Sequence, residues 1–178
     1  GYQLESMLGS GGFGVVYKAI QLNLDRVVAL KTIRLSQLKD ESIQKRFERE
    51  AKIVGKFRHP NIIAAYDFGL DKEHLYLAME FVQGQDAEHF VESNGPLEEF
   101  AVWQIIRQVS MALAYAAEHD VIHRDIKPGN LMLAKAPVGY NLPKNIPLVK
   151  VADFGLACFN ENHRLDDRLT IADKIGRA

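Results

Sequence analysis

Hydrophobic and polar residues alternate along the N-terminal part of the chain. This period of two predicts strands over residues 2–35, interrupted by a glycine-rich stretch at 9–14 and a polar turn at 23–26. Further strands are predicted at 62–68 and 75–82. In the strand that begins at residue 27, the alternation places four side chains on one face: Val27, Ala29, Lys31 and Ile33.

Two other segments repeat their apolar residues every three or four positions, which is typical of helices. The first runs roughly from residue 41 to 56 with Asp40 as its N-cap, and its inward stripe comprises Ile43, Phe47, Ala51 and Val54. The second covers 97–119. We expect its apolar residues, the tryptophan included, to pack on a core: Phe100, Trp103, Ile106, Val109, Leu113 and Ala116.

The pattern changes from strand-rich to helix-rich at residues 82–84, where Gly84 ends the last strand of the first half. We therefore divide the chain into one lobe at 1–82 and a second at 83–178. In the second lobe, short strands are predicted at 131–133 and 148–152. The residues between them include three prolines, Pro137, Pro143 and Pro147, and are expected to form an irregular surface excursion.

Composition limits the classes of function. The chain has 178 residues, 47% of them hydrophobic, which is enough for one domain or two small lobes. Its formal net charge of -1 provides no basic field for nucleic acid or an anionic membrane. No apolar run is long enough to span a bilayer, and the single cysteine, Cys158, excludes an internal disulfide. We therefore expect a cytoplasmic protein, or the cytosolic domain of a larger protein that is membrane-anchored or not.

The glycine-rich stretch 9–14 interrupts the strands in a way that suits phosphate binding. Glycines allow positive φ angles and let backbone N–H groups approach an anion. A dinucleotide fingerprint requires a helix directly after its glycines, whereas a strand is predicted here. A Walker-type loop requires Gly-Lys-Ser/Thr, which is absent. The alternatives that remain are an ordinary glycine-rich turn and a hairpin that lies over phosphates.

Lys31 lies between apolar neighbours on its strand, beside the small Ala29, which leaves room for a flat ring. Glu50 falls on or beside the apolar stripe of the first helix, where an unpaired buried charge is costly. Lys31 is its best candidate partner. The alternative is that Glu50 faces water and that Lys31 extends its ammonium group to solvent.

Four polar residues near two strand ends carry the potential chemistry. In the loop 123–130, Asp125 can accept a proton, Lys127 can neutralise a phosphate and Asn130 can offer an amide oxygen to a metal. Asp153 follows a strand and precedes a glycine-containing corner, which suits a metal ligand. Singly, such residues are more often found in solvated turns and caps, so their significance depends on their occurring together.

The motifs follow one another along the chain as Gly9-x-Gly11-x-x-Gly14-x-Val16, Val28-Ala29-Leu30-Lys31, Glu50, His123-Arg124-Asp125 through Asn130, and Asp153-Phe154-Gly155. In this order they resemble a eukaryotic-type serine/threonine protein kinase domain. Lys127 is similar to the serine/threonine branch rather than the tyrosine branch. The resemblance implies an α+β fold with two lobes. The N-lobe would be an antiparallel β-rich sheet with one αC-type helix, and the second lobe would be the first part of a helical C-lobe.

The resemblance also implies the chemistry. ATP would give its γ-phosphate to Ser or Thr hydroxyls of protein substrates, with Mg²⁺ as the cofactor. The implied catalytic residues are the base Asp125, Lys127 at the γ-phosphate, and Lys31, held by Glu50, at the α- and β-phosphates. The implied Mg²⁺ ligands are Asn130 and Asp153. The implied nucleotide-binding residues form the glycine-rich loop, the adenine sandwich, the gatekeeper and the hinge: Leu8, Gly9, Ser10, Gly11, Gly12, Phe13, Gly14, Val16, Ala29, Lys31, Met79, Glu80, Phe81, Val82 and Met132.

The chain also departs from the family pattern, because it ends at Ala178 within what resembles the activation segment. The helices that carry the peptide-binding surface do not follow, so we expect these 178 residues alone to be poorly active. Thr170 is the only hydroxyl residue after Phe154 and is a candidate phosphorylation site. The alternatives are a pseudokinase-like nucleotide-binding or scaffolding module and a small-molecule kinase.

Overall fold

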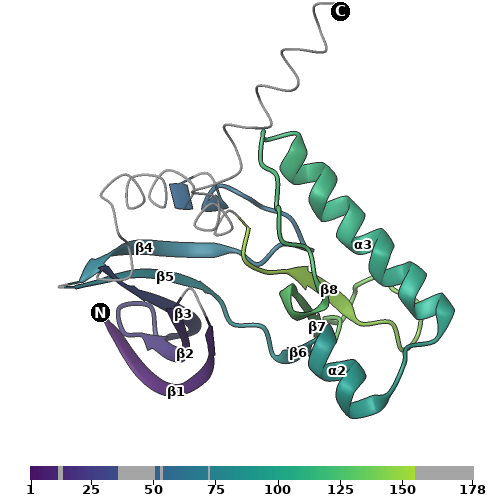
Figure 1. Ribbon diagram of the computed structural model, residues 1–178, viewed down its shortest axis with the longest axis horizontal. Helices are drawn as coiled ribbons and strands as arrows, with labels where there is room; N and C mark the ends of the chain where they lie inside the picture. The colour runs from purple at the N-terminus through teal and green to yellow at the C-terminus, as the bar shows by residue number, and fades with distance from the viewer. Residues whose placement is uncertain (12–13, 36–50, 53, 72, 155–178) are drawn as a thin grey trace, which may run out of the picture.

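The computed structural model describes residues 1–11, 14–35, 51–52, 54–71 and 73–154. These residues form two antiparallel sheets, with the longer strands gathered on one side of the molecule and the helices on the other (Figure 1). The elements are β1 (Tyr2–Gly11), β2 (Gly14–Gln21), β3 (Arg26–Arg34), β4 (Ala65–Asp71), β5 (His74–Glu80), β6 (Gly84–Asp86), α2 (Ala87–Asn94), α3 (Glu99–Ala117), the 3₁₀ turn η2 (Pro128–Asn130), β7 (Leu131–Ala134) and β8 (Leu148–Val151).

The first sheet has five antiparallel strands in the order β1-β2-β3-β5-β4. The predicted strands are confirmed, but β4 begins three residues later than predicted, at Ala65. Residues 62 and 63 lie instead beside β8 of the second sheet. There Ile62 forms a parallel bridge with Val151, and the Ile63 N–H donates to the Val151 carbonyl over 3.0 Å.

The five-stranded sheet curls until its two edge strands approach each other. Tyr2 on β1 donates its hydroxyl hydrogen to Asp67 Oδ2 on β4 over 2.7 Å. Small and branched residues fill one face of the curled sheet: Ala19, Val28, Leu30 and Ala78. Because side chains alternate along β3, Ala29, Lys31 and Ile33 point to the other face, as predicted.

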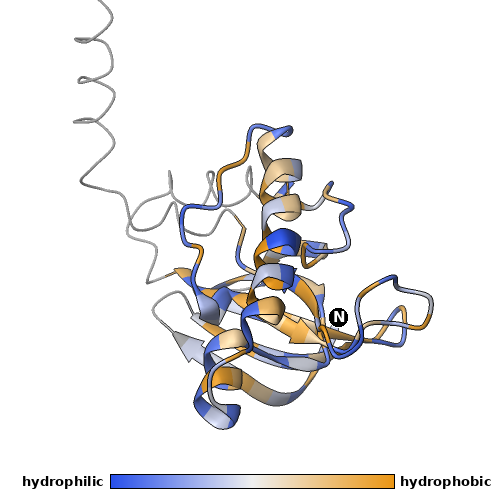
Figure 2. Cartoon of the chain, turned by 90° about the vertical axis from the view of Figure 1, so that its right-hand side faces the viewer, coloured by the Kyte–Doolittle hydropathy of each residue, from blue (hydrophilic) through white to orange (hydrophobic). Residues whose placement is uncertain are grey.

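The second sheet has three short antiparallel strands in the order β6-β7-β8. The strands predicted at 131–133 and 148–152 are therefore confirmed to within one residue. The excursion between them contains neither helix nor strand, as predicted. Apolar residues are frequent in β3, β7 and β8, and several connecting loops are more polar (Figure 2).

Helix α3 packs against β8, but not with the whole stripe that the spacing predicted. Its buried residues are Ile105, Gln108, Val109, Ala112 and Ala116. The prediction was right for Val109 and Ala116 and wrong for three others, which are largely exposed: Phe100 (56%), Trp103 (60%) and Ile106 (46%). A helix that is apolar on more than one side has several candidate faces, so its periodicity alone does not identify the buried one.

Helix α2 was not predicted. It begins after the N-cap Asp86, whose Oδ1 accepts the N–H of His89 over 2.9 Å. It ends at Gly95, which has a φ of 83° and donates its N–H to the Val91 carbonyl. Both ends carry ordinary capping chemistry, and Ala87 and Phe90 pack this short helix against the core.

Two buried amide side chains join the first sheet's connecting segment to the second lobe. Asn61 Nδ2 donates to Gln108 Oε1 over 3.0 Å and to the Val149 carbonyl over 2.8 Å. Gln108 Oε1 also accepts the Val149 N–H, and Gln108 Nε2 donates to the Pro147 carbonyl. His59, predicted to be structural, accepts the Asn61 N–H at Nδ1 over 3.1 Å. This network fixes β8, and hence Asp153 beyond it, against the first lobe.

Little of the first predicted helix falls within the described residues. Ala51, Lys52 and Val54 are helical, and the predicted inward residues Ala51 and Val54 are buried. Residues 41–50, and with them Glu50, lie outside the described part of the chain, as do Gly12, Phe13, Cys158 and Thr170. None of the helices in the described ranges is long and apolar enough to cross a membrane.

Candidate active site

A cavity of about 510 Å³ opens where the chain passes from the first sheet to the second. Nine of the residues predicted to bind the nucleotide line it: Leu8, Gly9, Val16, Ala29, Met79, Glu80, Phe81, Val82 and Met132. Asp153, one of the two predicted metal ligands, also lines it. Aliphatic side chains form much of its wall, which suits an apolar heterocycle.

The glycine-rich hairpin is only partly described. Ser10 and Gly11 end β1 and Gly14 begins β2, with Gly11 paired to Gly14; Ser10 and Gly14 are not among the described residues that line the cavity. Gly14 has a φ of 116°, and a Cβ atom there would overlap the carbonyl oxygen of Thr32. Glycine is therefore required at this position by the backbone and by close packing on β3.

Lys31 contacts Asp153, which lines the cavity, although Lys31 is not itself among the lining residues. Lys31 Nζ lies 2.8 Å from Asp153 Oδ1, and the lysine side chain is only 8% exposed. Asp153 follows β8 and has a φ of 59°, an uncommon backbone conformation that directs it away from the strand. The predicted pairing of Lys31 with Glu50 stays a prediction, because Glu50 lies outside the described residues.

The loop after α3 presents a carboxylate, an ammonium group and an amide side by side. Lys127 Nζ lies 2.9 Å from Asp125 Oδ2, and Asn130 Nδ2 donates to the Asp125 carbonyl (2.7 Å) and to Oδ2 (3.1 Å). The hydrogen bond from Lys127 holds the pKa of Asp125 below its usual value, and Asp125 in turn raises the pKa of Lys127. Asp125 is thus ionised at neutral pH and can accept a hydrogen bond or a proton.

His123 holds this loop against the segment that carries Asp153. A carbonyl oxygen can only accept, so Nε2 of His123 donates to the Ala152 carbonyl over 2.7 Å, while Nδ1 accepts the Asp125 N–H over 3.3 Å. The ring also packs edge-on against Phe154, with centroids 4.6 Å apart. Burial lowers the pKa of His123, so the imidazole is neutral, as these two hydrogen bonds require.

Asn130 and Asp153 retain oxygen atoms that suit a hard divalent cation. The Ala152 N–H donates to the Asn130 carbonyl over 2.9 Å, which brings the two segments together. Because Nδ2 of Asn130 is used by Asp125, Oδ1 is the atom left for a metal. Within the described part of the chain, Asp153 uses Oδ1 for Lys31 and keeps Oδ2. Mg²⁺ is typically bound by one or two carboxylates plus substrate phosphates. The described residues contain no cluster of three or more His, Cys, Asp or Glu, so phosphate oxygens would have to complete this site.

Sequence reasoning missed two polar pairs at the cavity. Lys150 on β8 lies 2.9 Å from Glu80 Oε2, which also accepts the Ala64 N–H. At the outer end, His89 Nδ1 lies 2.7 Å from Asp86 Oδ2, and the hydrogen bond to Asp86 raises the pKa of His89. Asp86 could have been found as a helix N-cap. The partner of Glu80 could not, because no local pattern links residues 80 and 150.

The comparisons with known proteins agree with this geometry. Residues 2–171 match the family model described as the protein kinase domain. The chain is 44% identical over 158 residues to serine/threonine-protein kinase pkn3 of Myxococcus xanthus and 35% identical over 156 residues to PrkC of Bacillus subtilis. It is 40% identical over 157 residues to PknJ of Mycobacterium tuberculosis. Each alignment covers 88% of this chain but only 28%, 22% and 26% of these relatives, so the chain spans about a quarter of their length.

Proposed function

The chain belongs to the protein kinase domain family, and on that basis we propose that it is the nucleotide-binding and catalytic part of a serine/threonine protein kinase. The reaction is transfer of the γ-phosphoryl group of ATP to a Ser or Thr hydroxyl of a protein substrate. The family implies ATP and protein substrates in general terms. The roles of individual residues, Mg²⁺ as the cofactor, and the cytosolic location are parts of the proposal.

One observation carries the proposal. Asp153, which lines the cavity, is in contact with Lys31, and the preceding residue, Ala152, is hydrogen-bonded to the loop that presents Asp125, Lys127 and Asn130. An ammonium group, a metal-ligand carboxylate and a proton acceptor at one cavity are the set that phosphoryl transfer needs. If Lys31 and Asp153 formed only a structural ion pair, it would not need the Asp125–Lys127 pair nearby.

In this reaction, the aliphatic wall residues Val16, Ala29 and Met132 hold the adenine ring, and the backbone after Met79 reads its edge. Lys31 binds phosphate oxygens. Asp125 orients the acceptor hydroxyl and takes its proton as the oxygen bonds to the γ-phosphorus, while the bond from that phosphorus to the β–γ bridging oxygen breaks. Lys127 neutralises charge on the transferred group. Such catalysis is mainly positioning and electrostatic stabilisation.

Asn130 and Asp153 are the residues that would hold Mg²⁺. When bound, the ion neutralises phosphate charge and orients the triphosphate. The hydrogen bonds from Asn130 to Asp125 also place the proton acceptor beside the metal ligand, so one side chain positions both.

The test is Mg²⁺-dependent phosphorylation of a Ser/Thr peptide by a polypeptide as long as the relatives. We expect transfer by the wild type and a fall of about 10²- to 10⁴-fold in the Asp125→Asn variant, with ATP affinity nearly unchanged. Asp120→Asn, an aspartate with a φ of 58° away from the cavity, serves as the matched control. Equal transfer by Asp125→Asn would overturn the assignment. ATP binding without any transfer by the wild type would favour the pseudokinase alternative.

A further inference from the structure

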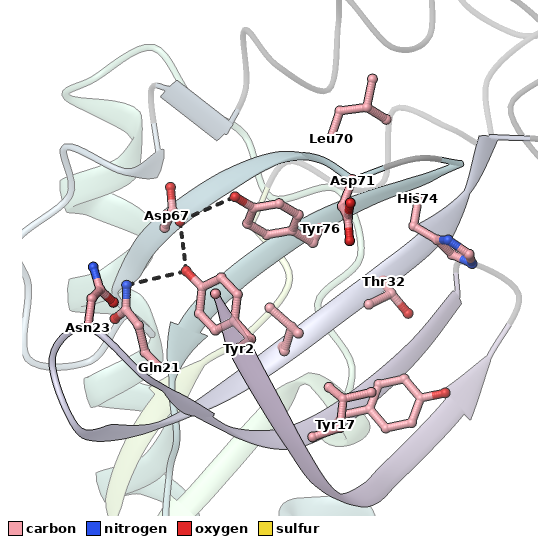
Figure 3. A pocket seen from close by; sticks show the side chains of 13 residues that line it. Tyr2, Tyr17, Gln21, Asn23, Thr32, Asp67, Leu70, Asp71, His74 and Tyr76 are labelled. Atoms are coloured by element: carbon pink, nitrogen blue, oxygen red, sulfur yellow. Dashed lines mark hydrogen bonds between the residues drawn. The ribbon is translucent and has the colours of Figure 1, made fainter.

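A second cavity, of about 630 Å³, lies against the curled five-stranded sheet and has no part in the proposed reaction. Figure 3 shows it from close by, with side chains contributed by every strand of that sheet. We call it the sheet-face cavity. The residues that matter for its chemistry are Tyr2, Tyr17, Thr32, Asp67, Asp71 and Tyr76.

The sheet-face cavity is separated from the nucleotide cavity by the thickness of the sheet. Leu30 and Thr32 of β3 line it, whereas the alternate residue Ala29 lines the nucleotide cavity. On β2, Tyr17 likewise lines the sheet-face cavity, whereas its neighbour Val16 lines the nucleotide cavity. The two cavities therefore share strands but no lining residue among those described, and a ligand of one does not occupy the other.

Aromatic rings form much of its wall. Tyr2 and Tyr76 pack with their centroids 5.5 Å apart and their planes inclined by 60°. Both hydroxyl groups donate to Oδ2 of Asp67, over 2.7 and 3.4 Å. Burial, and then the hydrogen bond to Asp67, raise the pKa of Tyr2, so its hydroxyl stays protonated and keeps donating. Tyr17 lies apart from this pair on the neighbouring strand β2 (Figure 3).

The side chains that line the cavity carry negative charge. Asp67 and Asp71 both line the cavity, and none of its described lining residues is Lys or Arg. Arg26 is engaged by neighbouring side chains: its guanidinium lies 3.7 Å from the ring centroid of Tyr66, and its Nε donates to Gln21, which itself lines the cavity. His74 is exposed at the rim. Tyrosine faces combined with carboxylates attract organic cations rather than anions or neutral apolar groups.

We propose that the sheet-face cavity binds an alkylammonium group, surrounded by Tyr2, Tyr17 and Tyr76 and neutralised by Asp67 and Asp71. Its volume lies in the range of small-molecule sites. The same chemistry is offered by a free quaternary amine and by a lysine side chain of a peptide. Neither this site nor such a ligand is part of the proposed phosphotransfer, so the two proposals stand or fall separately.

The experiment titrates the 178-residue chain with choline and follows its backbone amide resonances by NMR. The chain is N-acetylated, because Gly1 lines the cavity and its terminal ammonium would compete. We expect saturable shifts at Tyr17, Thr32 and Tyr76. The neutral isostere 3,3-dimethylbutan-1-ol should bind about tenfold more weakly. A second titration uses Nα-acetyl-lysine methylamide, which keeps the side-chain ammonium group. If this compound binds and choline does not, a peptide lysine is the source of the ammonium group.

Variants separate charge and aromatic contributions. Asp71→Asn and Tyr17→Leu should each weaken choline binding about fivefold or more, whereas Asp120→Asn should not change it. Asp67→Asn should weaken choline binding further. Because Asp67 accepts hydrogen bonds from two tyrosine hydroxyls, its replacement can also unfold the chain; in that case Asp71→Asn still tests the contribution of the negative charge. Equal binding of the neutral isostere, or shifts confined to Met79 and Val82 of the nucleotide cavity, would overturn the proposal. So would a lack of binding by both ammonium compounds.

Discussion

Lys31 Nζ and Asp153 Oδ1 lie 2.8 Å apart, although 122 positions separate the two residues in the sequence. The contact joins β3 of the first sheet to the end of β8 in the second. In the proposed reaction, Lys31 would exchange this partner for a phosphate oxygen, while Asp153 would offer its other oxygen to a metal ion. The binding of nucleotide and the binding of metal are therefore expected to be linked at this pair.

Replacing Asp153 should separate those two events. In Asp153→Asn, we expect the increase in ATP affinity that Mg²⁺ gives the wild type to shrink by at least about tenfold, because a carboxylate ligand is lost while the aliphatic walls remain. ATP affinity is measured by fluorescence with Mg²⁺ and with a chelator, and Asp120→Asn is the control. An Mg²⁺ effect that survives intact in Asp153→Asn would remove Asp153 from the metal site.

Two glycines of the same hairpin should respond differently to alanine. Gly14→Ala should lower the free energy of unfolding by about 1–3 kcal/mol, since it combines a φ of 116° with an overlap on the Thr32 carbonyl. Gly9→Ala should change it by less than about 0.5 kcal/mol, because nothing lies within 4 Å of a Cβ atom there. Urea unfolding of both variants checks the pair, and similar losses in the two would contradict the geometry.

The Glu80–Lys150 ion pair should show energetic coupling. Its side chains are 26% and 14% exposed, so removing one partner leaves a poorly hydrated charge. We expect Lys150→Met to cost about 1–3 kcal/mol. The double variant Lys150→Met/Glu80→Gln should lose less free energy of unfolding than the two single variants lose in sum. A double-mutant cycle in urea measures the coupling, and strict additivity would show that the contact contributes nothing.

The stability of the chain should depend on pH through His123. Burial lowers its pKa in the folded state, whereas the unfolded chain keeps a value of about 6.5. The unfolded state therefore binds the proton first, and the contribution of the neutral imidazole is complete above about pH 6.5 and is lost as the pH falls below it. The pKa of His59 is also lowered and acts in the same direction, while the raised pKa of His89 opposes it.

The measurement is the free energy of unfolding at pH 7, 6 and 5 for the wild type and His123→Gln. Glutamine can still donate to the Ala152 carbonyl but does not titrate. We expect the wild type to lose more stability over this range than the variant. If both lose the same amount, His123 is not the source of the pH dependence.

The parts of the site that could be predicted lie on one strand and in one loop. Alternation along β3 assigned Ala29 and Lys31 to one face without any knowledge of the fold, because the pleat leaves only two choices. The loop residues Asp125 and Asn130 were recognisable from their order and spacing. In the structure they hydrogen-bond to each other, but their catalytic roles stay predictions until variants are measured.

The parts that could not be predicted depend on contacts between distant segments. Trp103 has helical spacing like Val109, yet only the packing of β8 decides which of them is buried. Ile62 has the pattern of a strand, and it pairs with Val151 of the other sheet rather than extending β4. Such choices are made by tertiary packing, which competes successfully with local periodicity.

The buried amides of Asn61 and Gln108 have a thermodynamic consequence. Each donates or accepts across the junction between the lobes, so opening one lobe would leave the other with polar atoms stripped of partners inside a dry interior. Unfolding of either lobe while the other stays folded is therefore unfavourable. The described portions of the two lobes should lose their structure in one cooperative transition, as a single thermodynamic unit.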